Sequence, residues 1–580
     1  MNRKAPAVSL SPRASLPSWA DELRQRYLAG EASVFLLHGN TRDVQPTFEA
    51  DGSVQYVALR TFLERLFGRT KEVVAYYNIS EGLEFAQAAH KGLFLKAVNN
   101  IRISSGREVM PELPRTVSAT LNVVEELVTH EGSNAAIILD YVEMVAPNAD
   151  LAFMGEVEKA NLVTLVRLGA DAGLQAGNSV VVLITEQLSE VSRRLVASTN
   201  LTALEIPLPA EPARAAFVAE QDRKGVPTEL TDEQFAKVTA GLTLVQVRGV
   251  LRQARQSGES ISFRTVSRRK KAIIEQECHG LVEFVDPHHS FDDVGGNEGM
   301  KELLLRISSS IKAGRRQSVP MGVIFVGPMG TGKTFVAEAF AASSGLTCLK
   351  FKNFREKWVG STEGNLERIL RVVDGLGYAL LIIDEADRSL GNSGEGDGGT
   401  SSRVIARLKE FMSDTRHRGR VLIVMMTNRP DKLDTDLKRP GRFDMKIPFF
   451  FPEAVDERRQ IAEAIAKRAG LASKKKLDWR GLAEKTDGYS AAELEAVVLA
   501  AINTASWAER DHVTQADLDA ALVDVIPSRD TRMLEYMEML AVFESSSRTM
   551  LPARFRDLPT DEVQARLDHL RSKLGARALG

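Results

Sequence analysis

A short glycine-rich segment that ends in a lysine and a threonine is the strongest chemical signal in the sequence. Its residues are Gly327, Pro328, Met329, Gly330, Thr331, Gly332, Lys333 and Thr334. The spacing is that of G-x-x-x-x-G-K-[ST], in which the glycines let backbone N–H groups wrap an anionic phosphate chain. We expect the Lys333 ammonium to reach the β- and γ-phosphates of a triphosphate, and the Thr334 hydroxyl to bind Mg²⁺.

Two acidic residues follow an apolar run farther along the chain. The run begins at Ala379 and ends in Asp384 and Glu385. A carboxylate at the C-terminal end of a buried parallel strand lies beside phosphates bound at that edge of the sheet. We therefore expect Asp384 to hold Mg²⁺ and Glu385 to polarise an attacking water, which together would support hydrolysis of the triphosphate.

The elements that must position these groups can be recognised around them. Residues 323–326 are a β-branched and aromatic run typical of a buried parallel strand, and helical composition resumes after Thr334. A third apolar run, residues 421–428, ends in the amide of Asn428. Strand, loop and helix in this order argue against a glycine-rich turn that binds nothing, and predict the α/β fold of a P-loop NTPase with a parallel sheet.

Six motifs occur in order between residues 291 and 527. Their sequences are FDDVGG, GPMGTGKT, LLIIDEAD, MMTNRPDKLD, LKRPGRFD and TDGYSAAELEAVV. Together they resemble the AAA ATPases of the protein-remodelling clade, relatives of NSF, the proteasomal ATPases and the ATPase part of FtsH. The resemblance implies a full AAA module, a parallel sheet with a helical lid, and ATP and Mg²⁺ as its ligands.

The same resemblance assigns roles to residues outside the phosphate loop. It makes Asn428 the sensor that orients the water, and Arg439 and Arg442 the arginine fingers. Near the adenine it places Gly295, Gly296, Gly488 and Ala491. A guanidinium fork can stabilise the charge that spreads over the γ-phosphoryl oxygens. In this family the fingers reach the nucleotide of a neighbouring subunit, so the resemblance implies a ring, usually a hexamer.

The segment FREKWVGSTEGN, residues 354–365, lies where this family has the loop that faces the central pore. Lys357, Trp358, Val359 and Gly360 resemble its aromatic–apolar–glycine signature, which would let Trp358 grip an extended polypeptide by its apolar area. A tryptophan in the core is the alternative, against which three neighbouring charges argue. The glycine-rich stretch 391–403 resembles a second pore loop, although its composition fits an idle linker equally well.

The N-terminal half repeats the layout without the chemistry. Its apolar run 135–145 mirrors the acidic strand, with Asp140 aligned to Asp384 and Tyr141 in place of Glu385. Several such matches occur in the same order with near-equal spacing, which indicates a degenerate AAA-like module that should not hydrolyse ATP. An unrelated α/β domain with similar buried strands is the alternative. This arrangement is similar to that of the AAA-domain proteins of the cyanobacterial and chloroplast-reading-frame type.

These patterns predict six segments. We expect a disordered tail over 1–20, a degenerate AAA-like α/β domain over 21–205, its helical lid-like segment over 206–280, the AAA large subdomain over 281–450, a helical lid over 451–527 and C-terminal helices over 528–580. Apolar residues around Tyr536 recur at helical spacing. We expect that helix to pack on the lid, with a partner-docking stripe as the alternative.

Composition narrows the class of protein. The hydrophobic content of 44% and the charged content of 26% fit an ordinary globular protein, and the formal net charge of −2 offers no basic field for nucleic acid or membrane. The two cysteines, Cys278 and Cys348, exclude a disulfide framework and fit a cytoplasmic protein. No apolar run is long enough to span a bilayer, so we expect no membrane span.

The sequence favours an ATP-hydrolysing oligomeric AAA motor that remodels or unfolds a protein client through a central pore. The alternative is an ATP-dependent switch or scaffold whose degenerate N-terminal module binds partners. A nucleic-acid motor is the least favoured class, because the sequence has no basic stripe. A built-in metalloprotease is not expected, because the HExxH motif does not occur.

Overall fold

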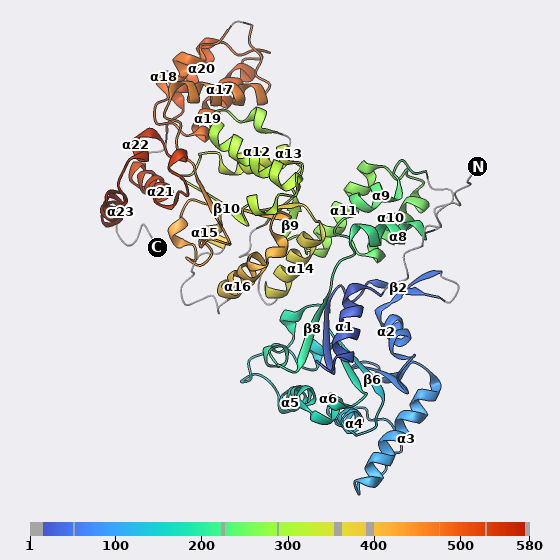
Figure 1. The fold of residues 1–580 in the computed structure, drawn as a ribbon. Helices are drawn as coiled ribbons and strands as arrows, with labels where there is room; N and C mark the ends of the chain where they lie inside the picture. Colours follow the sequence, from blue (N-terminus) through green and yellow to red (C-terminus); the bar gives the residue numbers. More distant parts are fainter. Residues whose placement is uncertain are drawn as a thin grey trace, which may run out of the picture. The chain divides into compact units, whose positions relative to one another are not determined.

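Two compact units, residues 1–273 and 274–580, make up the chain (Figure 1). The computed structural model describes residues 16–49, 53–221, 227–286, 289–352, 362–389, 400–474, 476–527 and 530–574. Of residues 362–363, 389 and 400–403 it describes the backbone alone. The boundary between the units falls within a helix, slightly before the boundary that the sequence suggests at residue 280.

A six-stranded sheet organises the second unit, in the order β14-β10-β13-β12-β11-β9. The strands are β9 (Val282–Phe284), β10 (Gly322–Val326), β11 (Thr347–Phe351), β12 (Ala379–Ile383), β13 (Val421–Thr427) and β14 (Met445–Pro448). All neighbouring strands pair in parallel except β9, which is an antiparallel edge strand. Because β10, β12 and β13 are buried throughout, they read as continuous apolar runs in the sequence.

Helices precede the first parallel strand and form most of the crossover connections that parallel strands require. They are α12 (Glu298–Lys312), α13 (Lys333–Ser344), α14 (Thr362–Gly375), α15 (Ala386–Ser389) and α16 (Thr400–Ser413). The lid follows as α17 (Val455–Arg468), α18 (Trp479–Lys485), α19 (Ala491–Trp507) and α20 (Gln515–Asp524). It has a hydrophobic core of its own, and Ser490 with Glu493 forms a capping box at the start of α19.

The C-terminal helices are α21 (Thr531–Glu544), α22 (Ala553–Arg556) and α23 (Thr560–Leu574). The expectation that α21 packs on the lid is wrong. Its main contacts outside this segment are with β10, β14 and the single turn η6 (Pro430–Lys432), all in the α/β part. Tyr536 and Leu540 are buried in a cluster that Phe450, which follows β14, joins. The amphipathic pattern predicted burial of this helix but not the surface that it covers.

The first unit contains a six-stranded sheet of the same design, in the order β5-β4-β6-β7-β1-β8. The strands are β1 (Val34–Gly39), β4 (Val73–Asn78), β5 (Gly82–Phe85), β6 (Ala135–Asp140), β7 (Val180–Ile184) and β8 (Leu201–Ile206). Both sheets place one antiparallel strand at the edge, with five parallel strands in equivalent sequence order. The predicted α/β repeat is therefore confirmed by the topology of the sheets.

The helices of the first sheet are α1 (Ser18–Leu28), α2 (Leu59–Phe67), α3 (Ala88–Ser104), α4 (Val117–Val128), α5 (Glu156–Ala170), α6 (Ala172–Ala176) and α7 (Arg193–Val196). Helix α1 begins inside the segment 1–20 that was expected to be a disordered tail. It is ordered there because Trp19 and Ala20 are buried in the core. After β1 the chain forms an antiparallel hairpin of β2 (Val44–Phe48) and β3 (Val54–Ala58) instead of a phosphate loop and helix.

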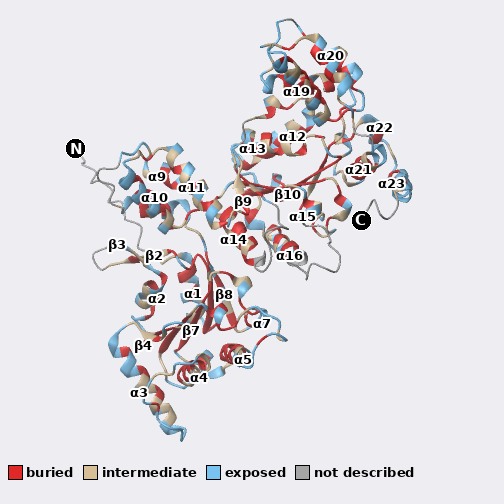
Figure 2. Ribbon diagram, turned by 180° about the vertical axis from the view of Figure 1, so that it is seen from behind, coloured by how far each residue is buried: buried red, intermediate tan, exposed pale blue. Residues whose placement is uncertain are grey.

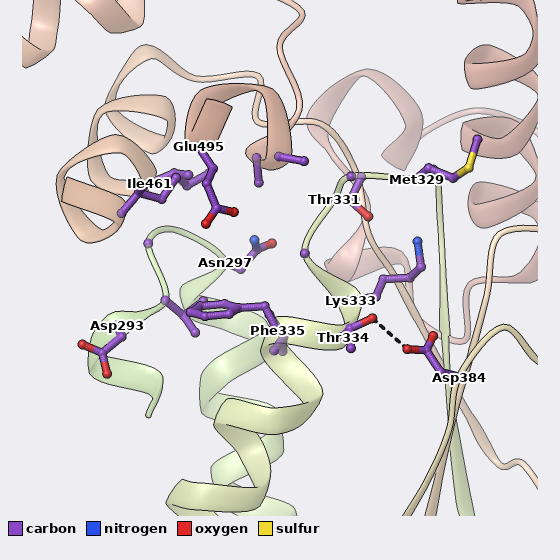
Figure 3. Close-up of a pocket in the computed structure, with 18 of the residues that line it drawn as sticks. Asp293, Asn297, Met329, Thr331, Lys333, Thr334, Phe335, Asp384, Ile461 and Glu495 are labelled. Atoms are coloured by element: carbon purple, nitrogen blue, oxygen red, sulfur yellow. Dashed lines mark hydrogen bonds between the residues drawn. The ribbon is translucent and has the colours of Figure 1, made fainter. Parts of the chain in front are cut away.

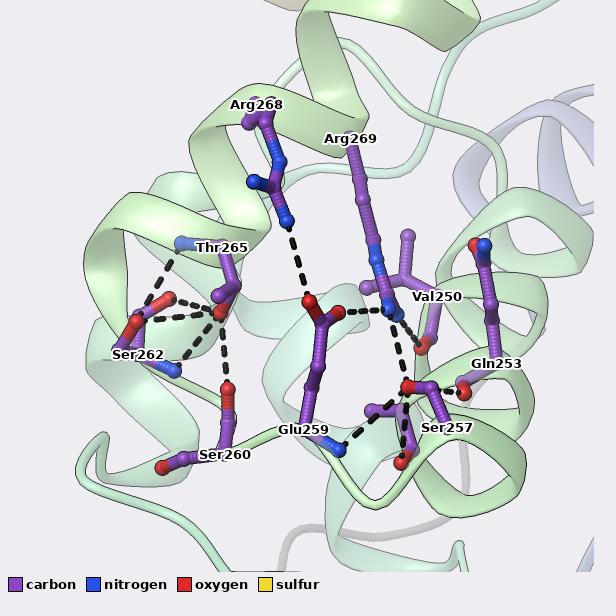
Figure 4. Close-up of polar contacts among 10 residues, drawn as sticks. Val250, Gln253, Ser257, Glu259, Ser260, Ser262, Thr265, Arg268 and Arg269 are labelled. Atoms are coloured by element: carbon purple, nitrogen blue, oxygen red, sulfur yellow. Dashed lines mark hydrogen bonds and ion pairs between the residues drawn. The ribbon is translucent and has the colours of Figure 1, made fainter.

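A helical part follows the first sheet, as the lid follows the second. It consists of α8 (Glu211–Ala219), α9 (Asp232–Val238), α10 (Leu244–Ser257) and α11 (Phe263–Glu277). The turn between α10 and α11 is fixed by Glu259, which pairs with Arg268 at 3.2 Å and Arg269 at 2.5 Å (Figure 4). Ser262 and Thr265 cap the start of α11 in the same view.

Each helical part has a buried arginine, Arg214 or Arg458, that ties its first helix to the next helix and to the linker from the sheet. Arg214 donates from Nε to the Ala236 carbonyl, and Arg458 donates likewise to Ala483, each over 2.9 Å. Each guanidinium also donates to the carbonyl of a proline in the preceding linker. Figure 2 shows that burial in each unit concentrates on the strands and on the inward faces of the helices. Within the described residues no helix is long and apolar enough to cross a bilayer.

Candidate functional site

The phosphate loop joins β10 to α13 and depends on its glycines for its shape. Gly327 has φ +153°, and a Cβ there would lie 2.2 Å from the carbonyl oxygen of Phe449. Gly330 has φ +78°, and its carbonyl accepts a hydrogen bond of 3.1 Å from the Ala492 amide of the lid. Side chains at these two positions would displace β14 or the lid, so the sequence uses glycine.

Lys333 is held inside the loop. It is only 9% exposed, and its Nζ donates to the carbonyls of Gly327 at 2.9 Å and Pro328 at 2.7 Å. Burial lowers the pKa of its ammonium to about 8, a shift that the nearby carboxylates of Asp384 and Asp387 oppose. The ammonium is thus poorly neutralised and strongly desolvated, and an anion entering the loop would be a better partner than the two carbonyls.

Thr334 and Asp384 meet at the end of the loop. The Thr334 hydroxyl donates to Asp384 Oδ2 over 3.1 Å, as Figure 3 shows, and Lys350 Nζ lies 3.4 Å from the same carboxylate. A hydroxyl and a carboxylate oxygen in contact are suitable ligands for Mg²⁺, which is normally bound by one or two protein oxygens plus phosphates and waters. The residues present therefore fit the ion that the phosphate loop implies.

Glu385 has an unusual backbone conformation. Its φ is +44°, in the left-handed region that costs a non-glycine residue about 1–3 kcal/mol. Its amide donates to Asp384 Oδ1 over 2.9 Å, and its exposed carboxylate pairs with Arg388 at 3.0 Å. The turn separates the two neighbouring carboxylates, so that Asp384 faces Thr334 while Glu385 is accessible to solvent.

One cavity of about 850 Å³ brings most of the predicted residues together (Figure 3). Those that line it are Gly295, Met329, Gly330, Thr331, Gly332, Lys333, Thr334, Asp384, Glu385, Asn428 and Ala491. Gly327 and Pro328 face Lys333 through their carbonyls, whereas Gly488, with φ +75°, lies in the turn before α19 and does not line the cavity. Gly296 also lies outside it and is held against the side chain of Glu457.

Several residues that line the cavity, or pack directly behind its wall, were not anticipated from the sequence. Phe335 stacks on His289 with ring centroids 3.9 Å apart, and the Arg468 guanidinium lies over the same ring at 4.4 Å. Arg468 in turn forms an ion pair with Glu495 of the lid. Phe335 directly follows the phosphate loop, which was a usable signal. His289, Arg468 and Glu495 come from distant segments that no local pattern connects.

The two predicted arginine fingers lie outside the cavity. Arg439 and Arg442 belong to the loop between η6 and β14, and neither lines the cavity. The Arg439 side chain is 72% exposed and pairs with Asp436 at 3.1 Å. Arg442 donates to the Asp436 carbonyl over 2.8 Å. The predicted pore residues Lys357, Trp358 and Val359 lie outside the described residues.

The corresponding place in the first unit is filled by the chain itself. Arg42, just after β1, pairs with Asp140 at 2.7 Å and with Glu186 at 3.0 Å. It also lies 4.1 Å from the ring centre of Tyr141, which has the same left-handed backbone as Glu385. The carboxylate of Asp43 accepts the amide of Leu244, at the start of α10, over 2.8 Å. In the segment after β1, where the second unit has its phosphate loop, the charges of Arg42 and Asp43 are therefore engaged by groups of the first unit itself.

Four domain models match the chain. The N-terminal Rossmann-like domain of AAA+ chaperones matches residues 5–207, and the second helical domain of AAA+ chaperones matches residues 212–279. The model of the ATPase family associated with various cellular activities (AAA) matches residues 323–451, and the AAA+ lid domain matches residues 476–520. These matches include most of both sheets and of both helical parts, but β9 and α17 lie outside the matched ranges.

Similar curated proteins point in the same direction. ATPase family gene 2 protein of Schizosaccharomyces pombe is 28% identical over 454 residues, covering 73% of this chain and 55% of that protein. The uncharacterized AAA domain-containing protein ycf46 of Trieres chinensis is 29% identical over 304 residues, covering 51% and 60%. The ATP-dependent zinc metalloprotease FtsH of Mesoplasma florum is 33% identical over 258 residues, covering 42% and 39%. The chain spans less than two thirds of each of these relatives.

Proposed function

We propose that the chain, whose matched domains are those of AAA+ chaperone-type ATPases, hydrolyses ATP in a ring of identical subunits to remodel a protein client. One observation carries this proposal. The groups that would bind and cleave the triphosphate share one cavity, whereas the two arginines lie outside that cavity and Arg439 is exposed. Such an arrangement leaves the site without its cationic cap until a second subunit supplies one.

The residues divide the work of hydrolysis between them. Lys333 exchanges the carbonyls of its own loop for the β- and γ-phosphate oxygens, and the loop amides hold the remaining oxygens. Glu385 leaves Arg388 to accept a hydrogen bond from the attacking water, which Asn428 orients. Thr334 and Asp384 are the residues that would hold Mg²⁺, which would supply positive charge to offset that of the phosphate oxygens.

The remodelling step rests on the resemblance at residues 357–360. We propose that the ring is a hexamer, as is usual in the AAA family, and that Lys357, Trp358 and Val359 serve as the pore residues that grip an extended polypeptide. The client is a protein rather than a nucleic acid, because the chain has a formal net charge of −2. A cytoplasmic location stays a prediction from the cysteine content.

Substitution of Trp358 tests the remodelling step. We expect Trp358→Ala to keep ATPase activity within about twofold, because Trp358 belongs to none of the motifs that bind or hydrolyse the nucleotide and would act by apolar contact with the client. The probe is fluorescently labelled unfolded casein, whose binding to a Glu385→Gln protein with ATP is followed by anisotropy. The pore assignment is supported if the Glu385→Gln protein binds casein and the Glu385→Gln/Trp358→Ala double variant does not. Binding that survives Trp358→Ala contradicts it.

An ATP-dependent switch is the second candidate function. The internal Arg42 and Asp43 contacts favour it, because they leave the first unit intact but give it no free loop for phosphate. In this version hydrolysis changes only the affinity of the first unit for a partner. Partner release that depends on ATP hydrolysis but is unaffected by Trp358→Ala would favour the switch over the motor.

A further inference from the structure

Helix α21 contacts the segment that follows the predicted sensor residue Asn428 and the strand that follows the two predicted arginine fingers. One is η6, which follows Asn428, and the other is the strand β14, which follows the two arginines. The sequence alone assigned this helix no role in catalysis. The polar contacts are made by Tyr536, which is fully buried, and by Glu544, two helical turns farther along, which is partly buried.

Glu544 bridges the two ends of the arginine loop. Its carboxylate forms an ion pair with Lys438, which directly precedes Arg439, and another with Lys446 of β14 at 3.0 Å. The Glu544 side chain is only 10% exposed. Beyond the helix, Ser546 exchanges two hydrogen bonds with the backbone of Lys446, at 2.7 and 3.1 Å. The loop that bears the fingers is therefore closed at its base by one carboxylate.

Charge explains why this carboxylate matters. Lys438, Arg439, Arg442 and Lys446 place four cationic side chains within a short stretch of chain. In the proposed ring Arg439 and Arg442 have to reach the phosphate of a neighbouring subunit, whereas Lys438 is held by Glu544 and by a hydrogen bond of 3.0 Å to the Pro430 carbonyl. A half-buried ion pair of this kind loses more when one partner is removed than it contributes as a pair.

Tyr536 supports the sensor side. It is fully buried, and its hydroxyl donates to Asp431 over 3.3 Å. Asp431 accepts two hydrogen bonds, of 3.0 and 2.9 Å, from Arg429, the residue after Asn428. Arg429 is anchored in turn, since its amide donates to the Thr427 hydroxyl over 2.9 Å. A continuous set of contacts thus links α21 to the backbone on both sides of Asn428.

We propose that Glu544 and Tyr536 are positioning residues for ATP hydrolysis, Glu544 for the arginine loop that serves the neighbouring subunit and Tyr536 for the sensor segment of its own subunit. The inference rests on the proposed function. Neither side chain touches the nucleotide cavity. Their loss therefore lowers the rate of hydrolysis and leaves ATP binding unchanged, because displaced arginine and sensor groups stabilise the transition state less well.

The test compares Glu544→Gln, Glu544→Asp and Tyr536→Phe in the full chain. We expect Glu544→Gln to lower kcat roughly tenfold with an unchanged Kd for a fluorescent ATP analogue, and Glu544→Asp to recover part of the loss. Tyr536→Phe removes only a hydroxyl, so folding is preserved, and we expect a smaller fall in kcat. Glu535→Gln, at an exposed position of the same helix, is the matched control with unchanged kcat.

A mixing experiment separates positioning from general stability. Glu544→Gln subunits have an intact cavity, so adding Glu385→Gln subunits, which have sound arginine loops, restores ATPase activity. Wild-type kcat in Glu544→Gln, or no recovery on mixing, overturns the inference. The double variant Arg439→Ala/Arg442→Ala separates failure of the proposed function from failure of this inference. If the double variant remains fully active, the proposed function fails. If the double variant is inactive while Glu544→Gln has normal kcat, only this inference fails.

Discussion

The ammonium of Lys333 decides how the site responds to pH at the scale of single residues. Burial lowers its pKa to about 8, so a large part of the protein carries a neutral amine above that pH. A bound triphosphate favours the charged form and raises the pKa again. ATP binding above about pH 8 therefore takes up a proton, and affinity falls as the pH rises through this window.

Calorimetry measures this linkage directly. ATP is titrated at about pH 8.5 in two buffers of different ionisation enthalpy, and we expect net proton uptake. Lys333→Arg provides the matched control, because a guanidinium stays charged over this range and its binding should release or take up no proton through this residue. Equal heats in both buffers for the unaltered protein would contradict the assignment of Lys333 to the phosphates.

How far single residues could be predicted depended on whether the chemistry lies in one stretch of sequence. The sequence predicted that the phosphate loop and the acidic pair lie together, and both line the cavity. The prediction was possible because the spacing of G-x-x-x-x-G-K-[ST] and the end of a buried strand each define a local geometry. The stack of His289, Phe335 and Arg468 was missed. Its members are far apart in the chain, and only the folded sheet and lid bring them together.

At the scale of elements, the lid approaches the sheet through a glycine. A Cβ on Gly295 would lie 2.5 Å from the Cα of Ile461 in α17. Gly295→Ala should therefore push α17 away from the cavity at a cost of about 1–3 kcal/mol. We expect roughly ten- to hundredfold weaker ATP binding.

Fluorescence titration with an ATP analogue provides the measurement. Gly299→Ala is the matched control, because that glycine lies in α12 and a Cβ there meets nothing within 4 Å. Alanine should be neutral or slightly stabilising at that helical position. The lid contact would lose its role in binding if both variants bound ATP like the unaltered protein.

Elements differed in how well the sequence defined them. The two sheets were predicted because central parallel strands leave apolar runs that end in turns. The hairpin β2–β3 was not predicted, because β3 has no fully buried position and its pattern is weak. The helix α21 was recognised but placed on the wrong surface, since amphipathicity shows that one face is buried and not what covers it.

For the whole molecule, the two units should differ in nucleotide binding. In the described part of the loop after β1, Arg42 is paired with Asp140 and Glu186, and Asp43 accepts the Leu244 amide at the start of α10. Neither the Arg42 cation nor that amide is therefore available to a phosphate. We expect one ATP per chain in equilibrium dialysis, and none for Lys333→Ala. A second ATP, retained in Lys333→Ala, would show that the first unit binds nucleotide.

The central claim is that two neighbouring subunits build each hydrolysis site together, and a mixture of two inactive proteins tests it most directly. Glu385→Gln subunits keep their arginines and lack the carboxylate that polarises water. Arg439→Ala/Arg442→Ala subunits keep the carboxylate and lack the arginines. We expect each protein alone to be inactive and their mixture to regain ATPase activity. A mixture as inactive as its components, or full activity of the arginine variant alone, would contradict the account.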